Sequence, residues 1–246
     1  MISILIPIYN GIEFIDESVT SVLNQTYAQW ELLIGINGHK INSPVYQTAK
    51  EYEKVSNKIK VFDFHEIKGK ANTLNELIKY CSYNYVAILD VDDIWNPKKL
   101  EIQSQYFVNN YDVIGTRCVW FGDRPGIIPH IPIGDISDCD FCGVNPIINS
   151  SCIIKKPFCY WSNKWDGVED YDLWLKLRKS GKRFYNCKEV LVKHRVHRQS
   201  AFNSKGNNDK VDSLLISHGF KSRLEMLIEK PKLNFPPVTK VNMNLF

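Results

Sequence analysis

Strand-like apolar runs alternate with segments of helical periodicity through the first part of the chain. Residues 2–8, 30–36 and 86–89 have almost no polar interruption, which is typical of strands buried on both faces of a parallel sheet. Residues 15–23 and 70–81, which lie between these runs, place apolar side chains at helical spacing. We therefore predict an α/β fold with a Rossmann-like, mostly parallel central sheet flanked by helices.

Turn and capping signals place the further elements. Asn96 followed by Pro97 predicts a helix start, because Asn caps helices and Pro suits the first helical position; this helix then extends to about residue 110. Residues 122–146 are rich in Gly, Pro, Asp and Cys and have no periodicity, and so long a loop is usually functional. The remaining predicted elements are strands at residues 58–63, 112–121, 149–154 and 183–197, and helices after Pro44 and at residues 169–180 and 211–229.

Composition and charge exclude several classes of protein. The 246 residues are 44% hydrophobic and 24% charged, as in ordinary globular proteins, and the net charge of +4 is spread along the chain without a basic arm. This argues against a dedicated nucleic-acid-binding protein. No stretch approaches the roughly 18 apolar residues of a membrane span. Residues 2–8 lack a basic leader, so we interpret them as a first strand and not as a signal peptide.

The cysteines indicate a reducing compartment. There are seven, an odd number, and the only close pair, Cys139 and Cys142, has no second pair that would complete a zinc site. We interpret them as free thiols and expect a cytoplasmic protein.

Three carboxylates follow the apolar run at residues 86–89. Asp90, Asp92 and Asp93 come at its carboxyl end, where open α/β sheets bind ligands, and clustered Asp oxygens suit Mg²⁺ or Mn²⁺. If the strand continued, Asp90 and Asp92 would point the same way, one toward a ligand and the other toward the metal. The alternative is a surface turn whose Asp side chains cap the next helix.

Five segments occur in an order that is more specific than any one of them. They are SILIPIYN at residues 3–10 with SVLNQTY at 21–27, GKANTLN at 69–75, LDVDD at 89–93, EDYDLWL at 169–175 and RVHRQS at 195–200. Together they resemble glycosyltransferase family 2, whose members have the GT-A fold, and the resemblance covers about residues 1–200.

The resemblance implies an inverting, metal-dependent glycosyltransferase. It would move a sugar from a nucleotide sugar, with a UDP-sugar favoured, to a hydroxyl of a glycan or glycoconjugate acceptor, using Mn²⁺ or Mg²⁺. It also implies a single domain at residues 1–230, with a nucleotide-binding half at 1–110 and an acceptor-binding half at 111–200, followed by a tail at 231–246.

The donor site implied by the resemblance departs from the family at two positions. Residues 36–39 read Ile-Asn-Gly-His where many members have an acidic pair that reads the nucleobase, and Leu74 replaces a usual Arg. Asn37 is then the best candidate for a contact with the nucleobase, and Lys70 is a second candidate. The residues expected to bind the nucleotide sugar are Pro7, Tyr9, Asn10, Asn37, Lys70, Asn75, Asp90, Val91 and Asp92.

The resemblance also assigns a metal site. Asp92 would be the main ligand, and His197 could join it because neutral imidazole accepts Mn²⁺. The alternative for His197 is a surface residue beside Arg195 and Arg198. Asp93 would either touch the metal, or orient Asp92 or cap the next turn.

A general base is expected at the segment that begins at residue 169. Asp170 is our choice, because the amino end of a helix favours the ionised carboxylate that a base needs. Glu169 is the close rival, and ordinary first-turn helix acids are the alternative for both. Trp165 is expected on the acceptor side, whereas Trp174 is expected in the core.

Other functions remain as alternatives. A nucleotidyltransferase also uses Asp-bound metal but needs no base at residues 169–170, and a glycosidase uses two carboxylates but needs no nucleotide-binding half. A catalytically silent nucleotide-sugar-binding protein is the non-enzyme alternative. The apolar positions of the helix at residues 211–229 suit either packing on the domain or contact with a membrane-bound acceptor.

Overall fold

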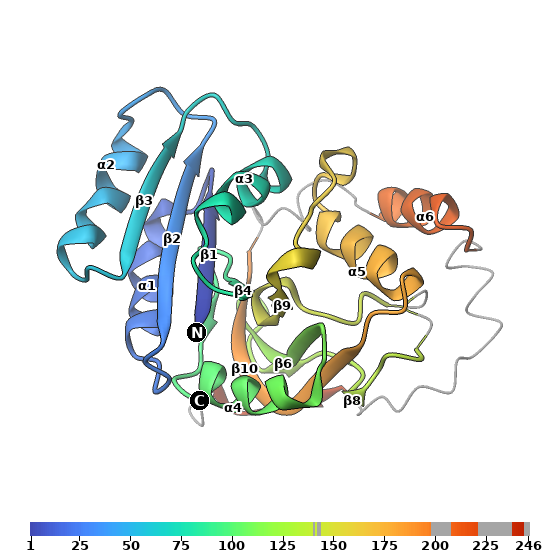
Figure 1. The fold of residues 1–246 in the computed structure, drawn as a ribbon. Helices are drawn as coiled ribbons and strands as arrows, with labels where there is room; N and C mark the ends of the chain where they lie inside the picture. The colour runs from blue at the N-terminus through green and yellow to red at the C-terminus, as the bar shows by residue number, and fades with distance from the viewer. Residues whose placement is uncertain (140, 142–143, 198–207, 221–237, 244–246) are drawn as a thin grey trace.

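One sheet runs through the protein and organises everything else. The structure is a computed structural model, and it describes residues 1–139, 141, 144–197, 208–220 and 238–243 (Figure 1). Within those ranges the sheet has nine strands. Eight follow the order β3-β2-β1-β4-β9-β6-β10-β5, and β8 pairs with β10 off this path.

The amino-terminal half of the sheet is parallel, as predicted. It contains β1 (Ile2–Ile8), β2 (Trp30–Asn37), β3 (Ile59–Phe64) and β4 (Tyr85–Ile88), with β1 between β2 and β4. Every residue of β1 and β2 is buried, which explains why their sequences are almost entirely apolar.

The carboxyl-terminal half joins the first through a short antiparallel strand. β9 (Ile153–Lys155) lies antiparallel to both β4 and β6 (Val113–Gly122). β6 is parallel to the long, bulged β10 (Phe184–Val196), whose other partners are β5 (Ile94–Trp95) and β8 (Gly134–Asp135), both antiparallel. The sheet is therefore mixed, although most of its long pairings are parallel.

Helices cover both faces of this sheet (Figure 1). The α-helices are α1 (Ile15–Leu23), α2 (Pro44–Lys50), α3 (Lys70–Leu77), α4 (Lys99–Ser104), α5 (Glu169–Lys179) and α6 (Asn208–Ser217). Short 3-10 helices lie at Ile12–Phe14, Glu51–Lys54, Ile78–Tyr80, Gln105–Asn109, Asn149–Ser151, Lys156–Phe158 and Asn163–Trp165. No helix in the described ranges is long and apolar enough to cross a bilayer.

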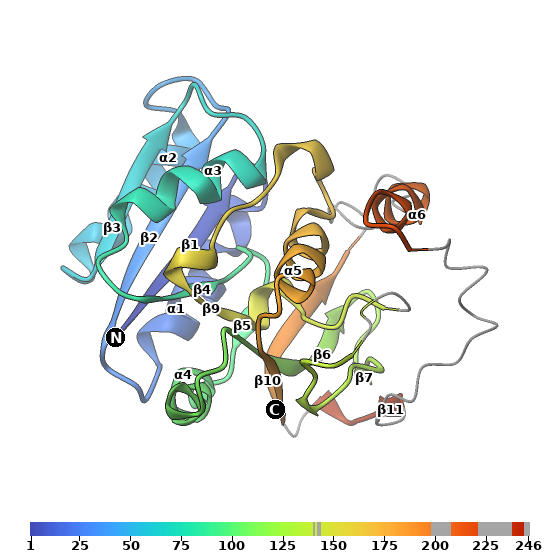
Figure 2. The same ribbon diagram turned by 45° about the vertical axis from the view of Figure 1, so that its right-hand side comes forward.

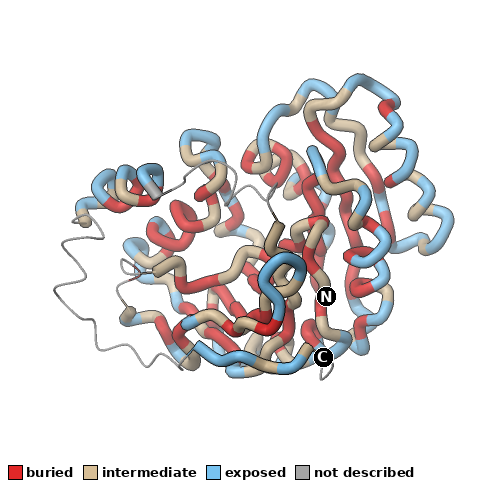
Figure 3. The backbone as a smooth tube through the Cα atoms, turned by 180° about the vertical axis from the view of Figure 1, so that it is seen from behind, coloured by how far each residue is buried: buried red, intermediate tan, exposed pale blue. Residues whose placement is uncertain are grey.

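Successive residues along a strand pack alternately into two separate hydrophobic cores, one on each face of the sheet. Ile4 and Ile6 belong to a cluster with residues of α1, whereas Leu5 and Leu33 pack with α3 and α5 on the other face. Trp174 of α5 is fully buried there, as expected. Viewed from behind, the strands are largely buried and the outer helices carry the exposed positions (Figure 3).

Several predicted boundaries were wrong for local reasons. The helix after Pro97 begins two residues late, because the Asn96 side chain accepts a hydrogen bond from the Lys98 backbone N–H and so forms a turn first. Residues 149–151, predicted as strand, form a 3-10 helix. The two-residue strands β5, β7 (Ile127–Ile128) and β8 are too short to leave a periodic signal.

The end of the chain returns to the domain. β11 (Thr239–Lys240) pairs with β7 (Ile127–Ile128), and Figure 2 shows this ribbon apart from the main sheet. In α6, Leu214 and Leu215 are fully buried with α5, so packing on the domain is confirmed for the described part of that helix. Residues 221–229 of the predicted helix and 231–237 of the predicted tail lie outside the described residues.

A lysine is buried beneath the sheet at the start of α4. Lys99 has no exposed surface, donates to the Gln103 side-chain oxygen at 2.8 Å and lies over the Trp95 ring, 3.9 Å from its centroid. Burial lowers the pKa of Lys99 to about 7, because neither partner carries a compensating negative charge.

This burial predicts a pH-dependent stability. Between pH 7 and 10.5 the unfolded chain protonates Lys99 more fully than the folded protein does, so the free energy of unfolding rises with pH. The slope from this one group is at most about 1.4 kcal/mol per pH unit. Urea denaturation at several pH values should show a smaller slope for Lys99→Met. The exposed neighbour Lys98→Met is the control, and a wild-type slope in Lys99→Met would contradict the assignment.

Candidate active site

The site is built at the carboxyl-terminal edge of the parallel strands, around Lys70. Lys70 opens α3 directly after Gly69, whose φ of 85° is a left-handed conformation that favours glycine. Its Nζ lies 2.5 Å from Asp90 Oδ1 and 3.9 Å from Glu169 Oε1. One ammonium therefore joins the segment after β4 to the start of α5.

The charges at Lys70 stabilise one another. Although burial opposes its charge, Asp90 and Glu169 raise the pKa of Lys70 above its ordinary value. Burial also opposes ionisation of Asp90, but Lys70 and the Asn149 amide hold the pKa of Asp90 below its usual range. Lys70 thus serves as the fixed counterion of Asp90.

Asp90 and Asp92 contact different partners, because the strand does not continue through them as the aligned arrangement would require. β4 ends at Ile88, and the Asp93 N–H donates to the Asp90 carbonyl at 3.0 Å, which closes a turn. Asp90 contacts Lys70, whereas Asp92 Oδ2 lies 2.9 Å from His197 Nε2. The turn gives the two carboxylates different partners, whereas a continuing strand would have aligned them.

Asp93 is used for structure. It is 1% exposed, and its two oxygens accept from the Arg195 backbone N–H at 2.8 Å and from His194 Nδ1 at 3.0 Å. The Asp93 charge raises the pKa of His194 to about 9. These contacts favour the alternative in which Asp93 orients Asp92, because Arg195, which Asp93 holds, also donates to the Asp92 carbonyl.

Arg195 fixes Asp92 from the other side. Its Nε donates to the Asp92 carbonyl at 2.9 Å and its Nη2 lies 2.7 Å from Glu17 Oε1. The guanidinium lies 4.3 Å from the ring centroids of both Phe14 and Phe121. The sequence showed Arg195 only as part of a motif and gave no sign of this role.

The two acids at the start of α5 differ in availability. Glu169 is 4% exposed, and its Oε2 accepts from the Gly167 N–H at 2.6 Å. Asp170 is half-buried, and its Oδ2 accepts from the Asn145 amide at 3.0 Å. Burial raises the pKa of both carboxyls, and Lys70 opposes the shift. Asp170 is the one with more access to a substrate.

The ends of β1 and β2 bring residues that are expected to bind the nucleotide sugar to the same edge of the sheet. The His39 imidazole donates to the Tyr9 carbonyl at 2.6 Å, and the two rings lie 5.2 Å apart. Tyr9 is 55% exposed and Asn10 is exposed, whereas Asn37 is buried at the last position of β2. Pro7 and Val91, two further expected donor residues, are also buried.

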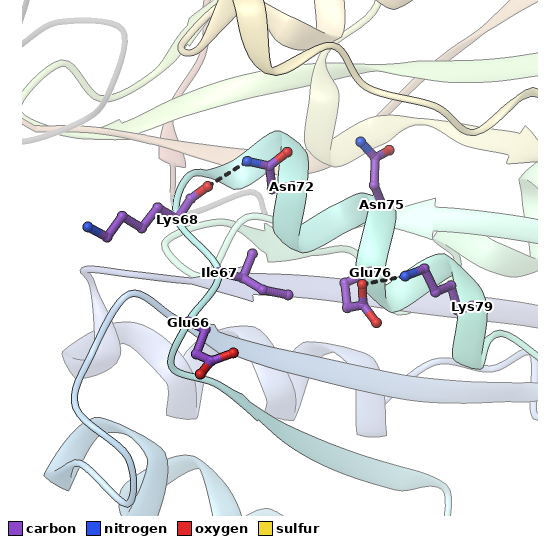
Figure 4. Close-up of a pocket in the computed structure, with 7 residues that line it drawn as sticks. All are labelled: Glu66, Ile67, Lys68, Asn72, Asn75, Glu76 and Lys79. Atoms are coloured by element: carbon purple, nitrogen blue, oxygen red, sulfur yellow. Dashed lines mark hydrogen bonds and ion pairs between the residues drawn. The ribbon is translucent and has the colours of Figure 1, made fainter.

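Asn75 is set apart from this group. Its amide donates to the Trp161 carbonyl at 2.7 Å and accepts from the Trp161 N–H at 2.9 Å, so it ties α3 to the segment before α5. It also lines a hollow of about 450 Å³ along α3, together with residues 66–68 (Figure 4). Trp165 is half-buried, with the Lys164 ammonium 5.0 Å from its ring centroid.

Asp92 and His197 form the best candidate metal pair. In the part of the chain that the structure describes, no group of three or more His, Cys, Asp or Glu side chains could hold an ion. Burial, then the charges of Asp93 and Asp90, raise the pKa of Asp92 to about 6. A cation would relieve this excess negative charge, and an oxygen and an imidazole nitrogen suit Mn²⁺ or Mg²⁺, so the pair fits.

Two amides that the sequence analysis did not single out complete the site. Asn145 bonds Asp170, and Asn149 lies 3.2 Å from each oxygen of Asp90. Asn145 lies near the end of the long loop predicted at residues 122–146, and Asn149 follows three residues after that loop. The prediction that this loop is functional pointed toward Asn145, and nothing in the sequence analysis pointed toward Asn149.

Comparisons with known proteins agree with this architecture. The model of glycosyl transferase family 2 matches residues 3–161. The O-antigen biosynthesis glycosyltransferase WbnJ of Escherichia coli is 29% identical over 212 residues, covering 81% of each chain. The UDP-Glc:alpha-D-GlcNAc-diphosphoundecaprenol beta-1,3-glucosyltransferase WfgD of Escherichia coli is 29% identical over 216 residues, covering 83% of this chain and 81% of WfgD.

Solved structures share the fold. S. aureus TarS in complex with UDP-GlcNAc superposes with a TM-score of 0.71 at 15% identity, covering 88% of this chain and 65% of that one. The mannosyltransferase PcManGT of Pyrobaculum calidifontis in complex with GDP-Man and Mn²⁺ gives 0.65 at 14% identity, covering 94% and 65%. This chain thus spans slightly less than two-thirds of these two structures.

The predicted GT-A fold is confirmed, since a curled, mostly parallel sheet flanked by helices is common to this chain and those structures. The family model covers more than half of the chain. The protein is a glycosyltransferase and belongs to glycosyl transferase family 2.

Proposed function

We propose that the protein transfers a sugar from a nucleotide sugar, with a UDP-sugar favoured, to a hydroxyl of a glycan or glycoconjugate, by a single displacement with inversion. One observation carries the proposal. Carboxylates from two distant segments, Asp90 on one side and Glu169 and Asp170 on the other, are gathered around Lys70 at the edge of the sheet where α/β proteins bind ligands.

The donor half comprises residues 1–110. Tyr9, Asn10 and Asn37 would line the nucleotide at the ends of β1 and β2, and Asp90, with its pKa held low by Lys70, would accept hydrogen bonds from the ribose hydroxyls. The UDP-Glc in the name of WfgD and the UDP-GlcNAc bound to TarS support a UDP-sugar, whereas PcManGT was solved with GDP-Man.

Asp92 and His197 would hold the divalent cation. The imidazole N–H that now points to the Asp92 carboxylate at 2.9 Å is the kind of proton that a bound metal replaces. When bound, Mn²⁺ or Mg²⁺ supplies Lewis-acid neutralisation of the diphosphate leaving group.

Asp170 would act as the general base. As the acceptor oxygen attacks the anomeric carbon, its proton passes to Asp170 and the bond to the diphosphate breaks on the opposite face. Glu169 is the weaker candidate because it is buried and already accepts from the Gly167 N–H. Trp165 and the segment at residues 122–146 would face the acceptor.

Nucleotide binding tests the donor half directly. Calorimetric titration with UDP, GDP, dTDP and CDP, each with Mn²⁺ and again with chelator, should show metal-dependent binding of one nucleotide, with UDP expected. Asp92→Ala should abolish the metal dependence, because it removes the main oxygen ligand. If no nucleotide binds under either condition, the donor site as proposed is wrong.

The base assignment predicts a difference between two neighbouring substitutions. Asp170→Asn should lower the turnover of UDP release from the UDP-sugar by about 10²-fold to 10⁴-fold, the usual contribution of a general base. Glu169→Gln should keep most of the activity, because its amide oxygen can still accept from Gly167. The reverse order of the two effects would assign the base to Glu169.

Stereochemistry tests the single displacement. With an α-linked UDP-sugar, proton NMR recorded early in the reaction should show the β-anomer of the released or transferred sugar, before mutarotation mixes the anomers. An α-anomer as first product would require a second displacement and would contradict the mechanism.

A further inference from the structure

We propose that Asn145 is a positioning residue for Asp170, and that residues 145–149 form a brace that holds the base and Asp90 in fixed relation. The inference rests on the proposed function, because it assumes that Asp170 is the base. It assigns a role to a segment in which the sequence has no motif.

The orientation of the Asn145 amide is set at both ends. Its oxygen accepts from the Ile147 N–H at 3.4 Å, and its nitrogen donates to Asp170 Oδ2 at 3.0 Å. A reversed amide would place its oxygen against the carboxylate and its nitrogen against an N–H donor. The Asn145 amide N–H therefore donates to one oxygen of the Asp170 carboxylate and restrains the position of that carboxylate.

The brace itself is anchored to the sheet. The buried Asn186 amide of β10 donates to the Pro146 carbonyl at 2.8 Å, and Ile147 has no exposed surface. At the other end, Trp95 Nε1 donates to the Ser150 carbonyl at 2.7 Å, and the Ser150 hydroxyl accepts from the Asp90 N–H at 3.0 Å. Asn145 is consequently fixed in position, so its hydrogen bond also restrains the position of the Asp170 carboxylate.

Asn145 and Asn149 close a ring of contacts across the site. Asn149 bonds both oxygens of Asp90, Asp90 pairs with Lys70, and Lys70 approaches Glu169, the neighbour of Asp170. The donor-side and base-side carboxylates are thus linked twice, once through the Lys70 ammonium and once through the brace.

A neutral hydrogen-bond donor such as the Asn145 amide suits the position beside Asp170. Asp170 faces the ammonium of Lys70 on α3, the carboxylate of Asp90 after β4 and the carboxyl of Glu169 on its own helix. Burial and then Asp90 raise the pKa of Asp170, whereas Lys70 and the Asn145 amide lower it. The amide favours the ionised base without adding a second positive charge that would compete for Asp90.

The test uses release of UDP from UDP-glucose and from UDP-GlcNAc with Mn²⁺, in which water takes the place of the acceptor and gives its proton to Asp170. In the plot of kcat against pH, Asn145→Ala should shift the acid limb to higher pH by about half a pH unit to one pH unit. At pH values below that limb, kcat should be about fivefold lower than in the wild type, as expected for one lost hydrogen bond. At high pH the activity should recover, with the KM for the donor unchanged throughout.

Two further variants sharpen the result. Asn145→Asp has the same shape but places a carboxylate beside Asp170, so it should move the acid limb further than Asn145→Ala does. The exposed Asn57→Ala is the matched control and should leave the profile in place. Circular dichroism and calorimetric binding of UDP confirm that each variant is folded.

The outcomes separate the two proposals. If the wild type is active and Asp170→Asn is not, but both Asn145 variants keep the wild-type acid limb or lose activity equally at every pH, the positioning role is overturned and the proposed function stands. If the wild type releases no UDP from either donor although it binds UDP with Mn²⁺, the proposed function fails and this inference fails with it.

Discussion

The contact between Lys70 and the carboxylates of Asp90 and Glu169 is the constraint on which the site depends. Buried acids are unfavourable unless they are paired, and here one ammonium at the first position of α3 serves acids from two distant segments. The helix α3 begins after β3, at the edge of the sheet. The contact between Lys70 and Glu169 therefore fixes the start of α5 against the parallel half of the sheet.

A second connection fixes the metal-binding side. The end of β10 reaches the turn after β4, where Asp93 accepts from Arg195 and His194, and Arg195 in turn holds the Asp92 carbonyl. Asp92 and His197 are then left facing each other with about a fifth to a quarter of each side chain exposed. Their neighbours are committed to structure, so these two side chains remain available for a cation.

The carboxylates of the site are stabilised by a charged partner and by neutral ones, and these two kinds of partner do different work. Lys70 stabilises Asp90 electrostatically, while the amides of Asn145 and Asn149 add directed hydrogen bonds without charge. This division matters because a cation and a diphosphate must also be accommodated, and every additional fixed charge would alter the affinity for both. The brace at residues 145–149 thereby supports the base while leaving the balance of charge to the ligands.

The sequence by itself determined the fold class and family, because β1 and β2 are buried on both faces and have almost no polar residues, and because the acids of the site lie in short ordered motifs. Only the tertiary structure decided how those acids are used. The turn after Ile88 gives Asp90 and Asp92 different partners, the contacts with β10 bury Asp93, and Asn145 meets Asp170 across 25 positions of chain. Local periodicity reports burial within one element, whereas these pairings arise between elements that become neighbours only after the sheet has formed.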